Sequence, residues 1–221
     1  MKKIFLFVLP AIFYCTDSFS QFGIRAGLNF ANVTKVSSIN NSSRSGFHAA
    51  VFLAPPSKSV LSYRTELIFS RQGYNYKTNT NSGNVGLDYI MMPQYMSINI
   101  TKYFSILLGA QMAFLINAKA DSSTNTGGSS SPYDGIMNYY NRFDYGYGCG
   151  IEIHPVSGLL IGARVNISLG KLYDPSSYSS GNSPSFIPKV DVKNNLFQVF
   201  AGWQFGVKNK NKKSEKKKEQ E

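Results

Sequence analysis

Strict alternation between apolar residues and small or polar residues is the feature that most constrains the fold of this chain. It is clearest in residues 143–153, where one parity holds Phe, Tyr, Cys and Ile and the other holds Asp, Gly and Glu. Successive side chains of a β-strand point to opposite faces, so a period of two predicts a strand with two chemically different faces. The sequence contains eight such stretches, which are residues 22–32, 46–54, 60–74, 87–100, 104–118, 143–153, 159–169 and 193–207.

The connections between these stretches alternate in length. The long segments, rich in Ser, Asn, Gly and Thr, are residues 33–45, 77–86, 119–142 and 170–192, and the short turns are residues 55–58, 101–103 and 154–158. Outer-membrane barrels combine short periplasmic turns with longer external loops, and their strands need roughly 9–11 residues to cross the bilayer at a tilt. The sequence therefore predicts an all-β fold, an eight-stranded antiparallel transmembrane β-barrel with four long external loops and short periplasmic turns.

The kind of polar residue on the second parity indicates which face is inside. Alternation alone fits a soluble lipocalin-like barrel as well, with its apolar face inward. A water-facing surface normally mixes Lys, Glu and Asp, but here the polar parity is mostly Gly, Asn, Ser and Gln, and lysine is absent from the strand interiors. We therefore expect the apolar parity to face outer-membrane lipid in a Gram-negative bacterium, with a soluble binder as the alternative.

Ionisable residues on the polar parity are balanced in charge, three positive and three negative, with His48 beside them. A buried charge is tolerated when it is paired and hydrogen-bonded, so this balance predicts an enclosed structural network inside the barrel. The predicted members are Arg25, Arg64, Glu66, Asp144, Glu152 and Arg164. Because eight strands leave an interior only wide enough for side chains, a diffusion porin is not expected.

The N-terminal segment differs in composition from the barrel. Residues 1–20 combine two lysines, an apolar run and the small-residue pattern Ser18-Phe19-Ser20, which predicts a cleaved signal peptide. The apolar run is too short for a membrane-spanning helix of about 20 residues. Cleavage would leave Cys149 as the only cysteine of the mature chain, so no intrachain disulfide is expected.

The C-terminal segment is a basic low-complexity tail. Residues 208–221 hold seven lysines and three glutamates, part of the net charge of +11. Such a run predicts a disordered periplasmic tail after a barrel domain of residues 21–207. Electrostatic attachment to an anionic surface or a periplasmic partner is the alternative. A secretory leader excludes nucleic acid as the expected partner.

Three segments resemble a known family. Residues 22–30 (FGIRAGLNF), 87–93 (LDYIMMP) and 202–205 (GWQF) resemble the PorT-like small outer-membrane β-barrels of Bacteroidetes. The resemblance implies an outer-membrane barrel, linked in the PorT case to secretion or envelope assembly. Residues 202–207 also resemble the last-strand signal that the barrel-assembly machinery reads, which would make that machinery a partner during insertion. Pro93 removes a ladder donor and predicts a bulge.

No motif predicts catalysis, a cofactor or a metal site. The glycines of residues 146–150 follow strand parity and open no helix, so they lack the setting of a phosphate-binding loop. Two histidines and one mature cysteine cannot readily supply three or four converging metal ligands. We expect a non-enzyme, although Asp144, Glu152 and His48 could supply parts of a catalytic set in an outer-membrane hydrolase or acyltransferase.

The expected role is structural or depends on binding through the external loops, since rigid scaffolds commonly bind through their loops. Residues 119–142 and 170–192 would contact a ligand or partner. The candidate contact residues are Tyr133, Tyr139, Tyr140 and Asn141. An accessory subunit of a secretion or envelope-assembly complex, with the tail holding a periplasmic partner, is the alternative.

Overall fold

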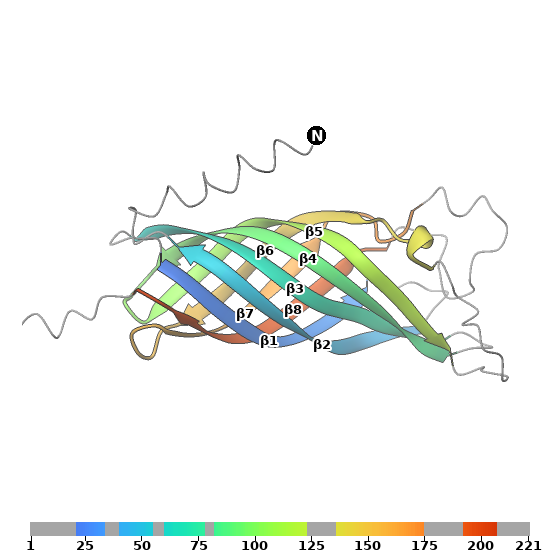
Figure 1. Ribbon diagram of the computed structural model, residues 1–221, viewed down its shortest axis with the longest axis horizontal. Helices are drawn as coiled ribbons and strands as arrows, with labels where there is room; N and C mark the ends of the chain where they lie inside the picture. Colours follow the sequence, from blue (N-terminus) through green and yellow to red (C-terminus); the bar gives the residue numbers. More distant parts are fainter. Residues whose placement is uncertain are drawn as a thin grey trace, which may run out of the picture.

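Eight antiparallel strands close into a barrel in which β8 pairs back onto β1 (Figure 1). The computed structural model describes residues 21–33, 40–54, 60–77, 82–122, 136–174 and 192–206. The elements are β1 (Gln21–Val33), β2 (Asn40–Ala54), β3 (Leu61–Lys77), β4 (Ser82–Asn99), β5 (Phe104–Ser122), the short 3-10 helix η2 (Ile136–Tyr139), β6 (Phe143–Ile153), β7 (Leu159–Ser168) and β8 (Asn194–Gln204). The predicted fold class is confirmed.

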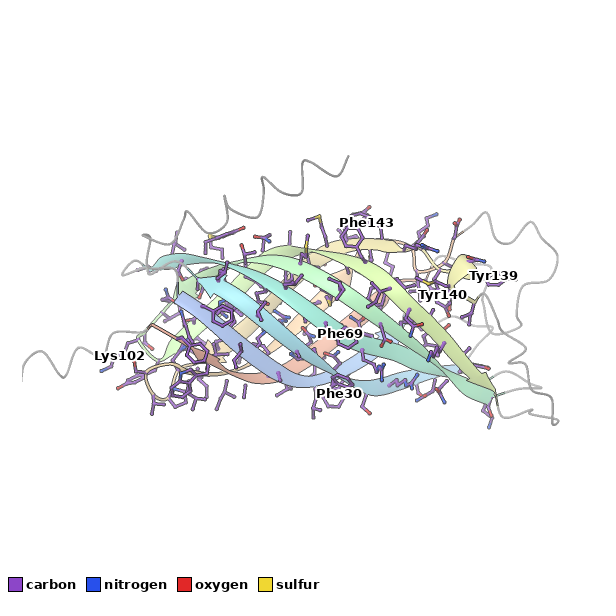
Figure 2. The ribbon with its side chains drawn as sticks, viewed as in Figure 1. Phe30, Phe69, Lys102, Tyr139, Tyr140 and Phe143 are labelled. Atoms are coloured by element: carbon purple, nitrogen blue, oxygen red, sulfur yellow. The ribbon has the colours of Figure 1, made fainter. Side chains whose placement is uncertain are left out.

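Apolar side chains cover the outer wall of the barrel. In β6, Tyr145 and Ile151 are exposed while Gly148 and Glu152 are buried, as the alternation predicts. Figure 2 shows Phe30 and Phe69 on the outer wall, away from the barrel axis. On the outer wall, Leu28 and Ile151 are 56% and 50% exposed, which suits contact with hydrocarbon.

Four consecutive strands are longer than the others. β2, β3, β4 and β5 have 15, 17, 18 and 19 residues, whereas β1, β6, β7 and β8 have 13, 11, 10 and 11. The extra residues lie at the end of the barrel opposite Gln21 and Gln204, where β3 and β4 remain paired up to Lys77↔Ser82. We assign this end to the cell exterior, because short turns such as residues 100–103 lie at the other end.

The long strands correct three of the predicted loops. Residues 77–86 are mostly strand, with only residues 78–81 outside the described part of the chain, and β5 continues through Ser122 instead of ending at 118. β2 likewise begins at Asn40, within the predicted loop 33–45. Strands that project above the membrane do not contact lipid, so neither face has to be apolar. These residues therefore lack the alternation seen in the membrane-spanning parts of the strands.

The bulge predicted at Pro93 is absent. Pro93 pairs in register with Gln111 of β5, and the register to β3 is the same on both sides of the proline. Only the pairs that Glu66 and Leu67 would make with β4 are missing, in keeping with the N–H that proline lacks. The irregular positions of the described ladders lie elsewhere, between Ser43 and His48 and between Asp88 and Tyr89.

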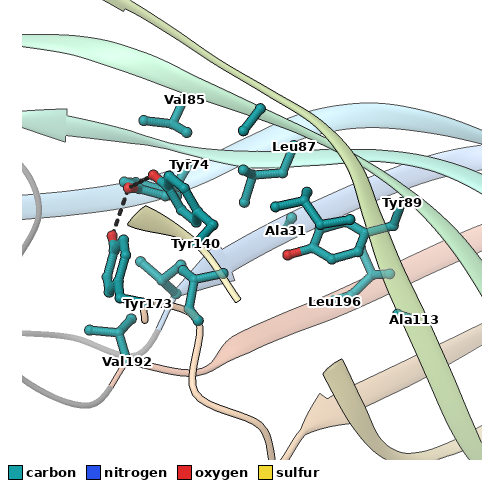
Figure 3. Packing of buried hydrophobic residues seen from close by; sticks show 14 of the residues in the cluster. Ala31, Tyr74, Val85, Leu87, Tyr89, Ala113, Tyr140, Tyr173, Val192 and Leu196 are labelled. Carbon is teal, nitrogen blue, oxygen red and sulfur yellow. Dashed lines mark hydrogen bonds between the residues drawn. The ribbon is translucent and has the colours of Figure 1, made fainter. Parts of the chain in front are cut away.

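Two buried apolar clusters occupy the barrel interior. The external cluster (Figure 3) includes Tyr74, Leu87, Tyr140, Tyr173 and Leu196. The periplasmic cluster consists of Phe52, Ala54, Tyr95, Leu107, Leu160 and Phe200. The sequence-based expectation of an interior lined mostly by small and polar residues is therefore incomplete, because inward positions at both ends carry large apolar side chains.

Candidate functional site

An arginine and a glutamate from distant parts of the chain form a bidentate ion pair inside the barrel. Arg64 Nη1 donates to Glu152 Oε1 at 2.5 Å, and Nη2 donates to Oε2 at 2.9 Å. The side chains are 5% and 0% exposed, so water screens this pair very little. β3 and β6 do not pair directly in the sheet, and this contact joins them across the barrel lumen.

Glu66 is the centre of the remaining ion pairs. Its Oε2 lies 2.7 Å from Arg25 Nη2 and accepts a hydrogen bond from Arg164 Nη1 at 2.8 Å, while Arg64 Nη1 lies 3.8 Å from Oε1. The side chains of Arg25, Glu66 and Arg164 are all 0% exposed. The five side chains of Arg25, Arg64, Glu66, Glu152 and Arg164, which we call the ion-pair network, thus link β1, β3, β6 and β7.

Aromatic rings cover the arginines of the ion-pair network. The guanidinium carbon of Arg25 lies 4.4 Å from the centroid of the Phe200 ring, and that of Arg164 lies 5.6 Å from the same centroid. Arg64 lies over Phe52 at 4.8 Å. Such cation–π contacts stabilise desolvated guanidinium groups. They also explain why a phenylalanine occupies position 200 on an inward parity that is otherwise largely polar.

Amide side chains extend the ion-pair network toward the exterior. Arg164 Nε donates to Gln198 Oε1 at 2.6 Å, and Gln198 Nε2 donates to Asn29 Oδ1 at 2.7 Å. Asn29 Oδ1 is also 2.8 Å from Nδ1 of His48, while Asn166 Oδ1 accepts from the Tyr95 hydroxyl at 2.7 Å. Sequence reasoning missed these amides, although their inward parity was a usable signal.

Asp144, the sixth predicted member, lies apart from the ion-pair network. Its carboxylate accepts hydrogen bonds from the Ser168 hydroxyl and from the backbone N–H of Tyr145. It lines a small cavity with Gln72, Gln111 and other residues below the external cluster. The ion-pair network therefore contains three arginines and two glutamates, not the balanced set of six that the sequence suggested.

Three tyrosines close the external end of the barrel (Figure 3). The hydroxyl of Tyr74 is 2.8 Å from the Tyr140 hydroxyl and 2.7 Å from the Tyr173 hydroxyl. The Tyr140 and Tyr173 rings have centroids 5.1 Å apart, and these residues form an isolated β-bridge. Burial raises the pKa of Tyr140 well above its usual value, so the hydroxyl stays protonated.

The residues predicted to contact a ligand through the loops lie in different environments. Tyr140 is only 2% exposed and joins the external cluster, so its ring holds two loops together. Asn141 Nδ2 donates to the backbone carbonyls of Lys171 and Tyr173 at 2.7 Å and 3.1 Å. Tyr139 is partly buried against the same cluster, and Tyr133 lies outside the described residues.

The groups considered for catalysis do not converge. His48 bonds to Asn29, Glu152 to Arg64, and Asp144 to Ser168. Within the described ranges, no three His, Cys, Asp or Glu side chains gather in an arrangement that could hold a metal ion. Cys149 is exposed on the outer wall. None of the helices in the described part of the chain has the length and apolar character needed to cross a membrane.

Comparisons with known proteins give one family and a set of similar folds. A family model described as "Outer membrane protein beta-barrel domain" matches residues 16–174. A search of curated protein sequences gives no match.

Solved structures similar to this chain are small barrels. The attachment invasion locus protein Ail of Yersinia pestis is 15% identical with a TM-score of 0.47, covering 84% of this chain and 99% of that one. Neisserial surface protein A is 16% identical with a TM-score of 0.44, covering 83% and 97%. OprG of Pseudomonas aeruginosa is 9% identical with a TM-score of 0.44, covering 84% and 96%.

Proposed function

Because the chain belongs to the outer membrane protein β-barrel domain family and lies in the outer membrane of a Gram-negative bacterium, we propose that it is a non-enzymatic binding protein. It binds a ligand or partner outside the cell through the sheet and loops at its external end. The observation that carries this proposal is the extension of β2 to β5 beyond the other strands, above a barrel filled with side chains.

The filled interior supports a role at the surface and argues against transport. The external cluster, the ion-pair network and the periplasmic cluster follow one another along the lumen, and Arg164 and Glu66 within it are fully buried. An eight-stranded barrel has room inside for little more than its own side chains. Because these groups fill the part of the lumen that the structure describes, we expect it not to conduct ions or solutes.

The external end supports a binding role because it is both projecting and rigid. Arg71 and Asp88 of neighbouring strands form an ion pair there, with Nε–Oδ1 and Nη2–Oδ2 distances of 2.8 Å and 3.2 Å. Asn117 of β5 donates to Asp88 Oδ2 at 3.0 Å. Since these side chains join β3, β4 and β5 above the barrel rim, they stiffen the projecting sheet.

A trimmed variant tests the proposed function. Replacing residues 75–84 with Asn-Gly would close β3 onto β4 after the Tyr74↔Val85 pair, leaving the tyrosine contacts in place. The protein in nanodiscs would be probed with arrays of anionic glycans and extended peptides, alongside this variant and one with residues 123–135 shortened. We expect binding by the wild type and its loss in at least one variant.

Two results would contradict this function. Ion conductance by the purified wild-type protein in planar bilayers would show an open lumen. Binding that is equal in the wild type and both variants would place the contact elsewhere. Heat-modifiable migration on a gel serves as the folding control for every variant, because a folded barrel resists detergent until it is heated.

The lysine-rich tail favours a second candidate, an accessory subunit of a secretion or envelope-assembly complex of the PorT-like type from Bacteroidetes. In this proposal residues 1–20 are a cleaved signal peptide, the barrel-assembly machinery inserts residues 21–207, and residues 208–221 hold an anionic periplasmic partner. Deleting residues 208–221 should abolish recovery of that partner after crosslinking without affecting insertion. Unchanged partner recovery would leave the surface-binding role as the better explanation.

A further inference from the structure

At the external end, β5 extends beyond β6, which is its neighbour on the side away from β4. β6 pairs with β5 only as far as Phe114↔Phe143, and one further hydrogen bond runs from Leu115 N–H to the Arg142 carbonyl at 2.7 Å. Residues 117–122 of β5 continue to pair with β4, up to Ser122↔Gly83. Among the described residues, no strand pairs with residues 117–122 on the other side.

We propose that this edge of β5, residues 117–122, binds an acidic extended segment of another protein as an added β-strand. The proposal rests on the surface-binding function and specifies where the contact forms. An unpaired strand edge presents backbone N–H and C=O groups at every second residue, and an extended peptide can satisfy them. The edge spans about 20 Å, enough for roughly six residues of added strand.

The two faces of the edge define the side chains that a partner needs. Ala118 and Ala120 are 9% and 7% exposed and point toward the external cluster, so the inner face is apolar and shallow. Lys119 is exposed on the outer face, and Arg142 is exposed where β6 begins. With Asp121 in the same segment, these residues leave a local charge of +1. A partner strand that alternates small apolar with acidic residues would match both faces, because successive side chains of a strand point to opposite sides.

A second copy of this chain does not suit the edge. Two identical barrels in one membrane are related by a rotation axis along the membrane normal. Because the strands are tilted by about 35–45°, the two facing β5 strands would cross each other and could not pair antiparallel. Lys119 can instead attract a strand that carries carboxylates.

The chain's own residues 123–135 also match this edge poorly in composition. They read STNTGGSSSPYDG, with one aromatic residue, a proline and three glycines, and no alternation of apolar with acidic residues. Gly, Pro, Asp and Asn are depleted in strands. An acidic segment from another protein is therefore the better occupant.

Hydrogen exchange on the full chain in nanodiscs tests the proposal. The probe is a synthetic peptide of about eight residues in which valine or threonine alternates with glutamate, and the control peptide has lysine in place of glutamate. We expect those amides of residues 117–122 that point away from β4 to exchange quickly alone and to become protected with the acidic peptide only. Lys119→Glu should weaken binding about fivefold to tenfold.

Lys77→Glu is the matched control variant, since it makes the same charge change at the external end. Lys77 lies inside the sheet, paired with both Asn40 and Ser82, and not at the β5 edge. We expect it to reduce peptide affinity less than twofold, because the change lies away from the edge. If both variants weakened peptide binding equally, the loss would come from the overall charge of the external end, and this would overturn the proposal.

Four further outcomes would also overturn it. If the amides of residues 117–122 that point away from β4 were already protected without peptide, another part of this chain would cover the edge. If protection were confined to residues 136–140 or 171–174, the peptide would bind at the external end but not to the β5 edge. If the acidic peptide did not bind while the glycan or peptide array gave a positive result, the surface-binding function would hold without the strand contact. A dimer crosslinked through β5 would identify a second copy as the occupant.

Discussion

Arg64 and Glu152, 88 residues apart in the chain, meet inside the barrel with both guanidinium Nη atoms on the two carboxylate oxygens. Their distance of 2.5 Å is shorter than the 3.8 Å between Arg64 and Glu66 and the 3.7 Å between Glu152 and His154, and water hardly reaches this space. Removing one partner leaves a buried charge without compensation, whereas removing both leaves a packing defect alone. This asymmetry gives the first prediction.

We expect Arg64→Ala or Glu152→Ala to lower the free energy of unfolding by about 3–5 kcal/mol. The double variant Arg64→Met with Glu152→Met should lose clearly less, since no unpaired charge remains. Urea unfolding midpoints in lysolipid micelles measure the difference. An unchanged midpoint in either single variant would contradict an enclosed, structural ion-pair network.

Glu66→Gln should be more damaging than Glu152→Gln. Glu66 contacts Arg25, Arg164 and Arg64, so its neutralisation leaves Arg25 and Arg164 without a contacting carboxylate. Neutralising Glu152 leaves all three arginines in contact with Glu66. We expect a loss in the free energy of unfolding at the upper end of about 3–5 kcal/mol. The same urea titration ranks the two variants, and the reverse order would show that Glu66 is not the centre of the network.

The tyrosine hydroxyls at the external end should contribute unequally. The Tyr74 hydroxyl bonds to the hydroxyls of both Tyr140 and Tyr173, whereas the Tyr140 hydroxyl bonds to that of Tyr74. Each hydrogen bond contributes about 0.5–1.5 kcal/mol, so Tyr74→Phe should cost about twice as much as Tyr140→Phe. Faster proteolysis within residues 136–140 would report the loosening, and equal rates in both variants would argue against this order.

Gly148→Ala should destabilise the barrel because the added methyl group has no room. A Cβ there would lie 2.4 Å from both the Tyr95 hydroxyl and Asn166 Oδ1, which share a hydrogen bond. Overpacking of this kind costs about 1–3 kcal/mol. Gly86→Ala is the matched control, since its nearest neighbour is the flexible end of Arg44 at 3.1 Å, and its midpoint should hardly change.

His154 should make the barrel sensitive to mild acid. Burial lowers its pKa below the ordinary value of 6.5, with Glu152 opposing the shift and Arg64 adding to it. The unfolded chain then binds a proton more readily, so stability falls as the pH drops below about 6.5. The urea midpoint of His154→Gln should fall less between pH 7.5 and pH 5 than that of the wild type; an equal fall would exclude this effect.

Most strands of the barrel were predictable because lipid requires apolar side chains on one face of every membrane-spanning strand. β6 has the predicted bounds, residues 143–153, since apolar and small residues alternate there without a break. The outer part of the β3–β4 hairpin was predicted as a loop, because strand pairing above the membrane imposes no such rule on Asn75 or Lys77. Hydrogen bonds across a hairpin leave little trace in composition.

The candidate site was predictable in membership but not in connectivity. Inward parity identified Arg25, Arg64, Glu66, Glu152 and Arg164, yet parity carries no information on height along the barrel. Asp144 shares that parity and lies instead beside Ser168, near the external end. Pairings such as Arg164 with Glu66 depend on strand register and tilt, which a single sequence does not reveal.

The ion-pair network also constrains how such a barrel can enter a bilayer. Its contacts join β3 to β6 and to β7, strands that meet only when the sheet has curled into a complete cylinder. A half-formed ribbon in hydrocarbon would expose these ionised groups, at about 2.5–3.5 kcal/mol for each arginine near the bilayer centre. Insertion of the strands into the bilayer and closure of the barrel are therefore expected to occur together. A chain that lacks some of its strands is expected to stay at the membrane surface.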